Sequence, residues 1–158
     1  MSTKAVSTSA HYQALLQLLR TAEMLWNSSR VFFDQWNLSP SQFNILNLLH
    51  LNPNGCTQIE LSRLLIMHRS NITGLVDRLE KRGLLQRKDS STDRRAYKVV
   101  LTSAGRKLIE KILPDYYAAA EKIWGNFPAA RTKQLVGDLE KLSKNIETFS
   151  QIHLEKQS

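Results

Sequence analysis

The amino-acid sequence predicts a mainly helical fold that is interrupted once by a small β-hairpin. Apolar residues recur with the helical period of 3.6 over residues 10–36 and again over residues 103–124. Residues 39–42 and 57–60 have the form of capping boxes, which mark the first turns of helices. Within residues 84–102, by contrast, apolar and polar residues alternate, as is typical of strands.

The first half of the chain is predicted to begin with two helices. Residues 10–36 carry most of their apolar side chains on one stripe, which indicates a long amphipathic helix. A second helix begins after Ser39, and Pro40 fits its first position because proline lacks the N–H that would be unpaired there. The turn residues of segment 52–55, Asn-Pro-Asn-Gly, end this helix.

A short helix, a break and a longer basic helix come next. Thr57 caps the short helix, the break falls at residues 66–67, and Gly83 is placed to end the longer helix over residues 68–83. This order is that of a helix-turn-helix unit, whose second helix reads DNA in the major groove. An ordinary surface helix is the plainer interpretation of the same pattern. The residues off the apolar stripe, most of them types that hydrogen-bond base edges or phosphates, are Arg69, Ser70, Asn71, Thr73, Gly74, Asp77 and Arg78.

Two short strands are predicted over residues 84–89 and 96–102, and the loop between them contains an acid and two arginines. A solvated hairpin turn is the plainer interpretation of this loop. The hairpin directly follows the basic helix, however, which is the place of a wing, so the helix and the loop can touch one DNA surface. The loop would then lie over the minor groove, which is narrow and electronegative and which arginine side chains commonly enter. Asp93, two residues before Arg95, can hold Arg95 in one pose through a charge-assisted hydrogen bond.

Positive charge is concentrated in this middle part of the chain. The formal net charge is +8, and the pI is about 9.8. Residues 68–98 hold nine basic and four acidic side chains, a net charge of +5, whereas residues 1–67 carry a net charge of only +1. The balance predicts a polyanionic partner, either nucleic acid or an acidic membrane, and its location favours the predicted helix and wing as the contact.

Two further helices are predicted to end the chain. Thr102 caps the first, over residues 103–124, and Pro114 inside it is expected to kink or divide it. The second carries apolar residues at a spacing of 4, 3, 4 and 3, which is typical of a coiled-coil contact. This C-terminal seam needs a partner, either within the chain or in a second copy. It consists of Leu135, Leu139, Leu142, Ile146 and Phe149.

The segment LVDRLEKRGLLQRKDSSTDRRAYKVVLTSAG, residues 75–105, resembles the MarR family of bacterial winged helix-turn-helix regulators. Two motifs of the family are present in it. The D-x-R motif is Asp93-Arg94-Arg95, and the L-T-x-x-G motif is the segment 101–105. The order of the predicted helices also agrees with the family over nearly the whole chain.

The resemblance implies a fold that is mainly α with a small β-wing, divided between a DNA-binding lobe and a helical dimerisation arm. Residues 37–102 would form the winged helix-turn-helix lobe. Residues 1–36 would be the N-terminal helix of the arm, and residues 103–158 its C-terminal helices. The resemblance further implies a homodimer that binds double-stranded DNA at a pseudo-palindromic operator, usually as a repressor.

The same resemblance assigns roles to individual side chains. Arg95 would enter the minor groove, with Asp93 orienting it. Arg78, Lys88 and Arg94 would contact phosphates, which position a protein without reading sequence. The start of the recognition helix would face bases and nearby phosphates. Its residues are His68 (for which a solvated place near the helix cap is the alternative), Arg69, Ser70, Asn71 and Thr73.

Members of this family often respond to small phenolic or other aromatic anions, which bind where the arm meets the lobe. By similarity, Trp26, Arg30 and Tyr116 are the expected effector contacts, with Arg30 as the partner of the anion. Packing in the core or in the dimer interface is the alternative for the two aromatic side chains.

The single cysteine, Cys56, lies just before the Thr57 cap, where the helix N-terminus could give the thiol some thiolate character; a structural role is the alternative. One cysteine excludes an internal disulfide framework and fits a reducing compartment. The four histidines are scattered without ligand spacing, so we expect no metal and no cofactor. Neither a signal peptide nor a membrane-spanning stretch is recognisable, so we expect a cytoplasmic protein without a membrane partner.

Two other classes of function compete with DNA binding. The sequence contains no Gly-rich phosphate loop, no G-x-S-x-G and no H-E-x-x-H motif, so we do not expect an enzyme. Cys56 and His50 could be imagined as a nucleophile and its base, but they lack the third group that would orient them. A winged protein-interaction module without specific DNA binding stays open, although such a module should lose the basic wing tip and polar recognition helix that this chain keeps.

Overall fold

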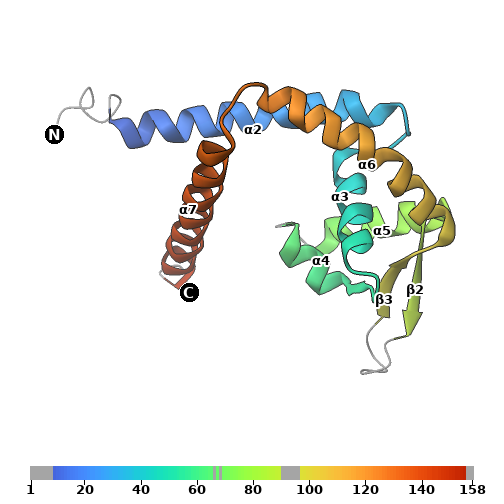
Figure 1. Cartoon of the computed structure of the whole chain (residues 1–158). Helices are drawn as coiled ribbons and strands as arrows, with labels where there is room; N and C mark the ends of the chain where they lie inside the picture. Colours follow the sequence, from blue (N-terminus) through green and yellow to red (C-terminus); the bar gives the residue numbers. More distant parts are fainter. Residues whose placement is uncertain (1–8, 66, 68, 90–96, 156–158) are drawn as a thin grey trace. The chain divides into compact units, whose positions relative to one another are not determined.

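The computed structural model describes residues 9–65, 67, 69–89 and 97–155, apart from the side chains of Arg69 and residues 153–155. The described residues form six α-helices and three short β-strands (Figure 1). The predicted fold class, mainly helical with one small sheet, is confirmed. In chain order the elements are α2 (Ala10–Asp34), α3 (Pro40–Leu51), β1 (Cys56–Thr57), α4 (Gln58–Leu64), α5 (Arg69–Lys81), β2 (Leu85–Asp89), β3 (Tyr97–Leu101), α6 (Ser103–Trp124) and α7 (Ala129–Glu155).

Both predicted capping boxes are present. At the start of α3, the Ser39 hydroxyl accepts a hydrogen bond from Gln42 N at 3.2 Å, and the Gln42 side chain accepts one from Ser39 N at 2.9 Å. At α4, Glu60 N donates to the Thr57 hydroxyl at 3.2 Å and Thr57 N donates to the Glu60 carboxylate at 2.7 Å. The hydrogen bond from Thr57 N–H also lowers the pKa of Glu60. Each box therefore satisfies two N–H groups that a helix start leaves unpaired.

The sheet is antiparallel, with strand order β1-β3-β2. Strands β2 and β3 are the predicted hairpin, whereas the two-residue strand β1, in which Cys56 pairs with Val99, was not predicted. Gly55 precedes β1 with a positive φ of 77°, and a Cβ there would lie 2.5 Å from Val100 Cγ1. Glycine is therefore required where the chain enters the sheet.

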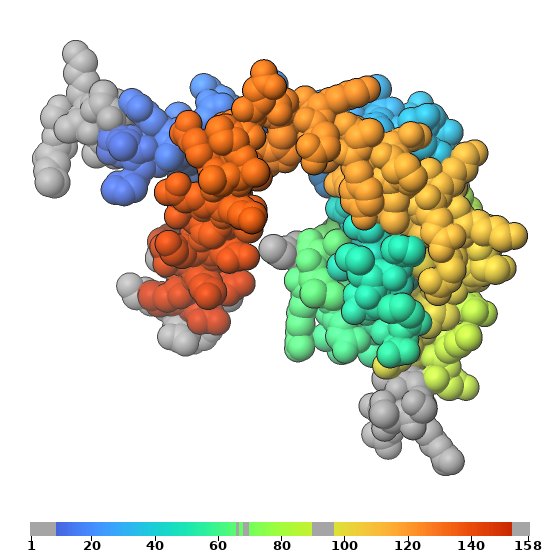
Figure 2. Space-filling model, viewed as in Figure 1, coloured from blue at the N-terminus to red at the C-terminus, as the bar shows by residue number. Residues whose placement is uncertain are grey.

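The core of the first part of the chain lies between α3, α5, the sheet and the start of α6. The rings of Phe33 on α2 and Phe43 on α3 stack at 4.2 Å between centroids, which holds these two helices together. In Figure 2, the surfaces of α3, α4 and the start of α6 face the viewer. The largest fully buried side chains are Phe33, Phe43, Ile45, Leu46, Leu49, Leu61, Ile72, Val76, Leu79, Leu85, Ile109 and Ile112.

The end of α5 and the start of α6 meet in one hydrogen-bonded corner. Gly83 has a φ of 69°, and Leu84 N donates to Leu79 O at 3.0 Å, which is the Schellman ending that Gly83 predicted. Thr102 N donates to Leu84 O at 3.1 Å, and the Thr102 hydroxyl donates to Gly83 O at 2.6 Å. That hydroxyl also accepts from Gly105 N at 3.0 Å, so Thr102 caps α6 as predicted.

The chain forms two compact units, Met1–Leu113 and Pro114–Ser158. Helix α6 nevertheless runs without interruption through Pro114, so of the two predicted effects of this proline, a kink or a division of the helix, the division is wrong. The physical reason is that proline removes one backbone hydrogen bond, while the buried side chains of Ile112 and Leu113 anchor the turn before it. Pro114 itself is exposed to solvent.

The second unit consists of the rest of α6 and helix α7. Its apolar side chains lie largely on the surface of the single chain, and the C-terminal seam is exposed along its whole length. Where α6 gives way to α7, the rings of Trp124 and Phe127 lie 5.5 Å apart between centroids, and the Arg131 guanidinium lies 5.4 Å from the centre of the Phe127 ring. No helix in the described part of the chain is both long enough and apolar enough to cross a membrane.

Candidate nucleic-acid interface

Helix α5, the predicted recognition helix, buries one stripe and leaves two flanks with different surroundings. The buried stripe consists of Ile72, Leu75, Val76 and Leu79. The flank toward the sheet, which we name the wing-side flank, consists of Thr73, Asp77 and Glu80. The other flank, which we name the exposed flank, consists of Ser70, Asn71 and Arg78, all of which are exposed.

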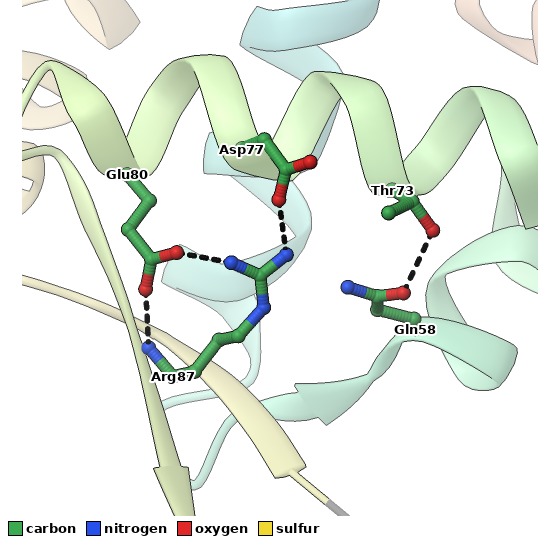
Figure 3. A network of polar contacts seen from close by, with 5 residues as sticks. All are labelled: Gln58, Thr73, Asp77, Glu80 and Arg87. Atoms are coloured by element: carbon green, nitrogen blue, oxygen red, sulfur yellow. Dashed lines mark hydrogen bonds and ion pairs between the residues drawn. The ribbon is translucent and has the colours of Figure 1, made fainter.

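The wing-side flank is held by Arg87 of strand β2 (Figure 3). Arg87 N donates to Glu80 Oε1 at 3.0 Å, and the guanidinium binds both the other oxygen of Glu80 and Asp77 Oδ1. The hydrogen bond to Asp77 raises the pKa of the Arg87 guanidinium, against the opposing effect of partial burial. Two carboxylates therefore share one arginine, and the group locks the hairpin to the recognition helix rather than facing a partner.

The same flank is joined to α4 at its other end. The Thr73 hydroxyl donates to Gln58 Oε1 at 2.9 Å, so that the two helices of the helix-turn-helix are tied by a side-chain hydrogen bond (Figure 3). Thr73, which was predicted to face bases, is half-buried in this contact. The wing-side flank thus fixes the geometry of the unit, and the exposed flank is the part of α5 that is turned to solvent.

The exposed flank borders a shallow hollow of about 300 Å³. Ser41 of helix α3 lies on its far side, so the hollow separates the first turn of α3 from the recognition helix. Its lining residues are Ser41, Met67, Ser70, Asn71, Gly74, Leu75 and Arg78. Serine, asparagine and arginine are the types that hydrogen-bond base edges and phosphate oxygens, and here they are presented together.

The wing carries two lysines directly opposite each other. Lys88 on β2 is paired in register with Lys98 on β3, so both side chains leave the hairpin on the same face. Like charges at directly opposed positions destabilise a strand pair. A phosphate between these two ammonium groups would turn the repulsion into attraction, which makes this face of the hairpin suited to an anionic partner.

The predicted DNA contacts divide into four groups in the structure. Ser70, Asn71 and Arg78 gather on the exposed flank, and Lys88 is exposed on β2. Thr73 lies on the wing-side flank with Gln58 as its partner. The backbone of Arg69 opens α5, while its side chain is outside the described part. The predicted contacts that lie outside the described residues are His68, Asp93, Arg94 and Arg95.

Three residues that position or extend this surface were not predicted: Gln58, Arg87 and Lys98. A signal for Arg87 was present in the sequence. The strand alternates from the buried Leu85 through the exposed Gln86 to Arg87, so an arginine stands at an inward position and needs a carboxylate. No comparable signal marked Lys98, because its importance follows from the register with Lys88.

A larger hollow of about 670 Å³ lies along the end of α2 and the start of α3. Arg30, the predicted anion partner, is one of its lining residues, but Trp26 and Tyr116 are not. Trp26 lies one helical turn before Arg30 on α2, and Tyr116 belongs to the second compact unit. The lining residues are Asn27, Arg30, Val31, Asp34, Asn37, Leu38, Ser39, Pro40 and Gln42.

Cys56 is buried in strand β1. Burial raises the pKa of its thiol, and the charge of Glu60 raises it further against the opposing charge of Lys98. The thiolate is therefore disfavoured, which supports a structural role over the reactive one. Among the residues that the structure describes, no three His, Cys, Asp or Glu side chains gather as metal ligands would.

Comparison with known proteins identifies the family. The profile described as MarR family matches residues 36–96. The HTH-type transcriptional regulator FarR of Neisseria gonorrhoeae is 32% identical over 137 residues, which are 85% of this chain and 93% of FarR.

Solved structures agree with this likeness. A MarR/EmrR family transcriptional regulator from Acinetobacter sp. ADP1 superposes with a TM-score of 0.80 at 21% identity, covering 89% of this chain and 99% of that one. A MarR family regulator from Listeria monocytogenes, solved in complex with a 26mer DNA, has a TM-score of 0.76 at 25% identity and covers 84% of this chain and 87% of its own. The chain therefore belongs to the MarR family of DNA-binding transcriptional regulators, with a winged helix-turn-helix as its DNA-binding unit.

Proposed function

We propose that the protein is a repressor that binds a pseudo-palindromic operator as a homodimer and leaves it when a small aromatic anion binds. The observations that carry the proposal are the polar exposed flank of α5 and the Lys88–Lys98 pair of the wing, two elements that Arg87 ties together. The Listeria protein was solved in complex with a 26mer DNA, which supports DNA binding by this chain. In this proposal residues 37–102 form the DNA-binding lobe, and residues 1–36 and 103–158 form the dimerisation arm.

Within the lobe the contacts would divide between reading and positioning. Ser70 and Asn71 would reach base edges in the major groove, together with His68 and Arg69, whereas Thr73, which was predicted to do so, is engaged by Gln58. Arg78, Lys88 and Arg94 would bind phosphates, and Lys98 would join Lys88 on one phosphate. Arg95 at the wing tip would enter the minor groove, with Asp93 orienting it.

Binding to DNA can be measured by fluorescence anisotropy on a duplex from upstream of the protein's own gene, with a scrambled duplex of the same composition beside it. We expect tighter binding to the native duplex, and an affinity that falls with salt by a slope of about −0.9 per neutralised phosphate. A steep slope without preference would mean nonspecific binding. Absence of binding to both duplexes at low salt would favour the protein-interaction module instead.

Arg95→Ala is expected to weaken binding to the native duplex by about tenfold or more, or about 1.4 kcal/mol, because it removes the guanidinium from the minor groove. The matched control is Lys133→Ala, which removes one positive charge from the face of α7 opposite the C-terminal seam. Anisotropy titrations at fixed salt compare the two variants. If Arg95→Ala and the wild type bind the duplex with equal affinity, Arg95 of the wing does not contribute to DNA binding.

The exposed apolar surface supports the dimer in this proposal. The C-terminal seam is exposed in the single chain, and α2 exposes further large apolar side chains such as Leu15, Leu19 and Leu25. Contiguous apolar surface of this kind marks an interface. A dimer covering two half-sites on promoter DNA would exclude other proteins from that DNA, which is the simplest route to repression.

Release by an effector is supported by the larger hollow. Its lining combines one guanidinium, Arg30, and one carboxylate, Asp34, with amide and hydroxyl groups and with apolar Val31 and Leu38. Arg30 is the group that would hold the carboxylate of a small aromatic anion. Asn37 lines the same hollow and belongs to the connection between α2 and α3. A ligand there would press on the segment that joins the arm to the lobe.

Salicylate is the probe that tests this part of the proposal. We expect it to weaken binding of the wild-type protein to the native duplex by about tenfold or more, within the range of typical allosteric coupling. Arg30→Gln should abolish this response while keeping DNA affinity, because it removes the charge that holds the carboxylate. Arg20→Gln, on the same helix and away from the hollow, serves as the control. A response that survives in Arg30→Gln would place the anion elsewhere.

A further inference from the structure

Arg82, the residue directly after α5, makes contacts that neither DNA nor an effector requires. Its Nη1 donates to Asn37 O at 2.6 Å, and its Nη2 donates to Trp36 O at 3.3 Å. Both carbonyls belong to the connection between α2 and α3. One guanidinium therefore joins the end of the recognition helix to the end of the arm helix, across 45 residues of sequence.

The connection needs such a partner because of how α2 ends. Asn37 N donates to Asp34 O at 2.8 Å and Leu38 N donates to Phe33 O at 3.2 Å, which closes the helix in a Schellman turn. Asn37 holds the left-handed position with a φ of 52°, which favours glycine over other residues. The carbonyls of Trp36 and Asn37 lie beyond the last turn, where no helical N–H is available to them. A cation at this end also complements the helix dipole.

Two arginines thus tie the C-terminal half of α5 to its surroundings: Arg87 ties it to the wing, and Arg82 ties it to the arm helix. The two ties act in different directions. Arg87 fixes the recognition helix relative to the hairpin within the lobe. Arg82 fixes it relative to α2, so that the angle between α5 and the arm depends on this contact.

We propose that Arg82 is a positioning residue that sets the spacing of the two half-sites which the dimer accepts. The proposal rests on the proposed function, because it needs a dimer whose arms carry two recognition helices. Such helices enter the major groove about 34–36 Å apart, one turn of DNA. A change in the angle between α2 and α5 moves both helices, and a shift of one base pair at that distance alters the register of every base contact.

The proposal separates Arg82 from the basic residues of α5. The donors of Arg82 are directed at two carbonyls, so its removal should leave the number of neutralised phosphates unchanged. Arg78, on the exposed flank, should behave in the opposite way. Removing Arg78 should reduce the magnitude of the salt slope by about 0.9 and keep the spacing of the half-sites.

The test is selection of binding sites from a randomised duplex library of about 40 base pairs, long enough to hold two half-sites a turn apart. Wild type, Arg82→Ala, Arg82→Lys and Arg78→Ala are compared. We expect wild type and Arg78→Ala to select one centre-to-centre spacing. Arg82→Ala should spread over neighbouring spacings and lose about tenfold in affinity for the wild-type site, with its salt slope unchanged. Arg82→Lys should behave similarly, because one ammonium cannot reproduce the planar fork that spans two carbonyls.

A second-site variant distinguishes positioning from a general loss of stability. Asn37→Gly adopts the positive φ without strain, so it should restore part of the single spacing in the Arg82→Ala background. The hydrogen bonds of Arg82 are exposed to solvent, so the thermal unfolding midpoint of Arg82→Ala should lie less than about 4 °C below that of the wild type. Should Arg82→Ala fail to fold, Arg82→Lys carries the same test.

Two results would overturn the inference. One is an unchanged single spacing in Arg82→Ala and Arg82→Lys; the other is a salt slope reduced by about 0.9, which would make Arg82 a phosphate contact. If the wild-type protein selects no sequence from the library, the proposed function is wrong, and the inference about Arg82 fails with it. The failures of the two proposals are therefore distinguishable.

Discussion

Leu139→Lys is expected to convert the proposed dimer into monomers and to lower DNA affinity by more than about 100-fold, because the two DNA-binding lobes are then no longer linked and the second half-site contact loses its effective concentration. Leu139 lies at the centre of the C-terminal seam, and 37% of its surface is exposed in the single chain. Because only this fraction remains to be buried, covering each such leucine with a second copy contributes about 0.5–1 kcal/mol, roughly a third of the value for full burial. A lysine at this position would bring an unpaired ammonium into an apolar contact, which costs more than the lost methyl groups.

Sedimentation velocity over a range of concentrations would measure the oligomeric state, and anisotropy on the native duplex would measure binding. Thr148→Lys is the matched control, since it adds the same charge to the same helix on the face away from the seam. It should remain dimeric and bind DNA as the wild type does. A Leu139→Lys protein that is fully dimeric would show that the interface lies elsewhere, for example on the exposed apolar residues of α2.

Local chemistry explains why much of the fold could be predicted. The boxes at Ser39 and Thr57 each depend on residues three positions apart, and Gly83 ends α5 through its own backbone freedom. Such features require no knowledge of distant parts of the chain. Pro114 is the counter-example, since its effect depends on how well the neighbouring turns are anchored, and α6 continues through it.

The candidate site was harder to predict, because its geometry depends on pairs far apart in the sequence. Thr73 is among the predicted base contacts, yet its hydroxyl is used by Gln58, which becomes visible only when α4 and α5 are in place. Arg82 looks like one more basic residue on a basic helix until the α2–α3 connection is placed beside it. The sequence also locates the positive charge in the segment 68–98. Arg87, however, offers no charge to a partner, because the carboxylates of Asp77 and Glu80 neutralise its guanidinium.

The L-T-x-x-G motif acquires a physical meaning in the corner between β3 and α6. Thr102 supplies the cap, and Gly105 supplies the space that lets the first turn of α6 approach the Leu84 carbonyl. A Cβ on Gly105 would lie 2.1 Å from Leu84 O and 3.0 Å from Leu84 C, both of them backbone atoms. Leu84 O cannot yield easily, because it also accepts the hydrogen bond from Thr102 N.

Gly105→Ala should therefore lower the free energy of unfolding by about 3 kcal/mol, at the upper end of the usual effect of overpacking. Helix propensity alone predicts the opposite, a gain of about 0.5–1 kcal/mol, so the sign of the change decides which effect is larger. Gly137→Ala is the control: it is also helical, nothing lies within 4 Å of its Cβ, and propensity should stabilise it. Urea unfolding of the two variants measures both changes. A stabilised Gly105→Ala would mean that α6 can move away from Leu84 without loss, and that the glycine of the motif has another role.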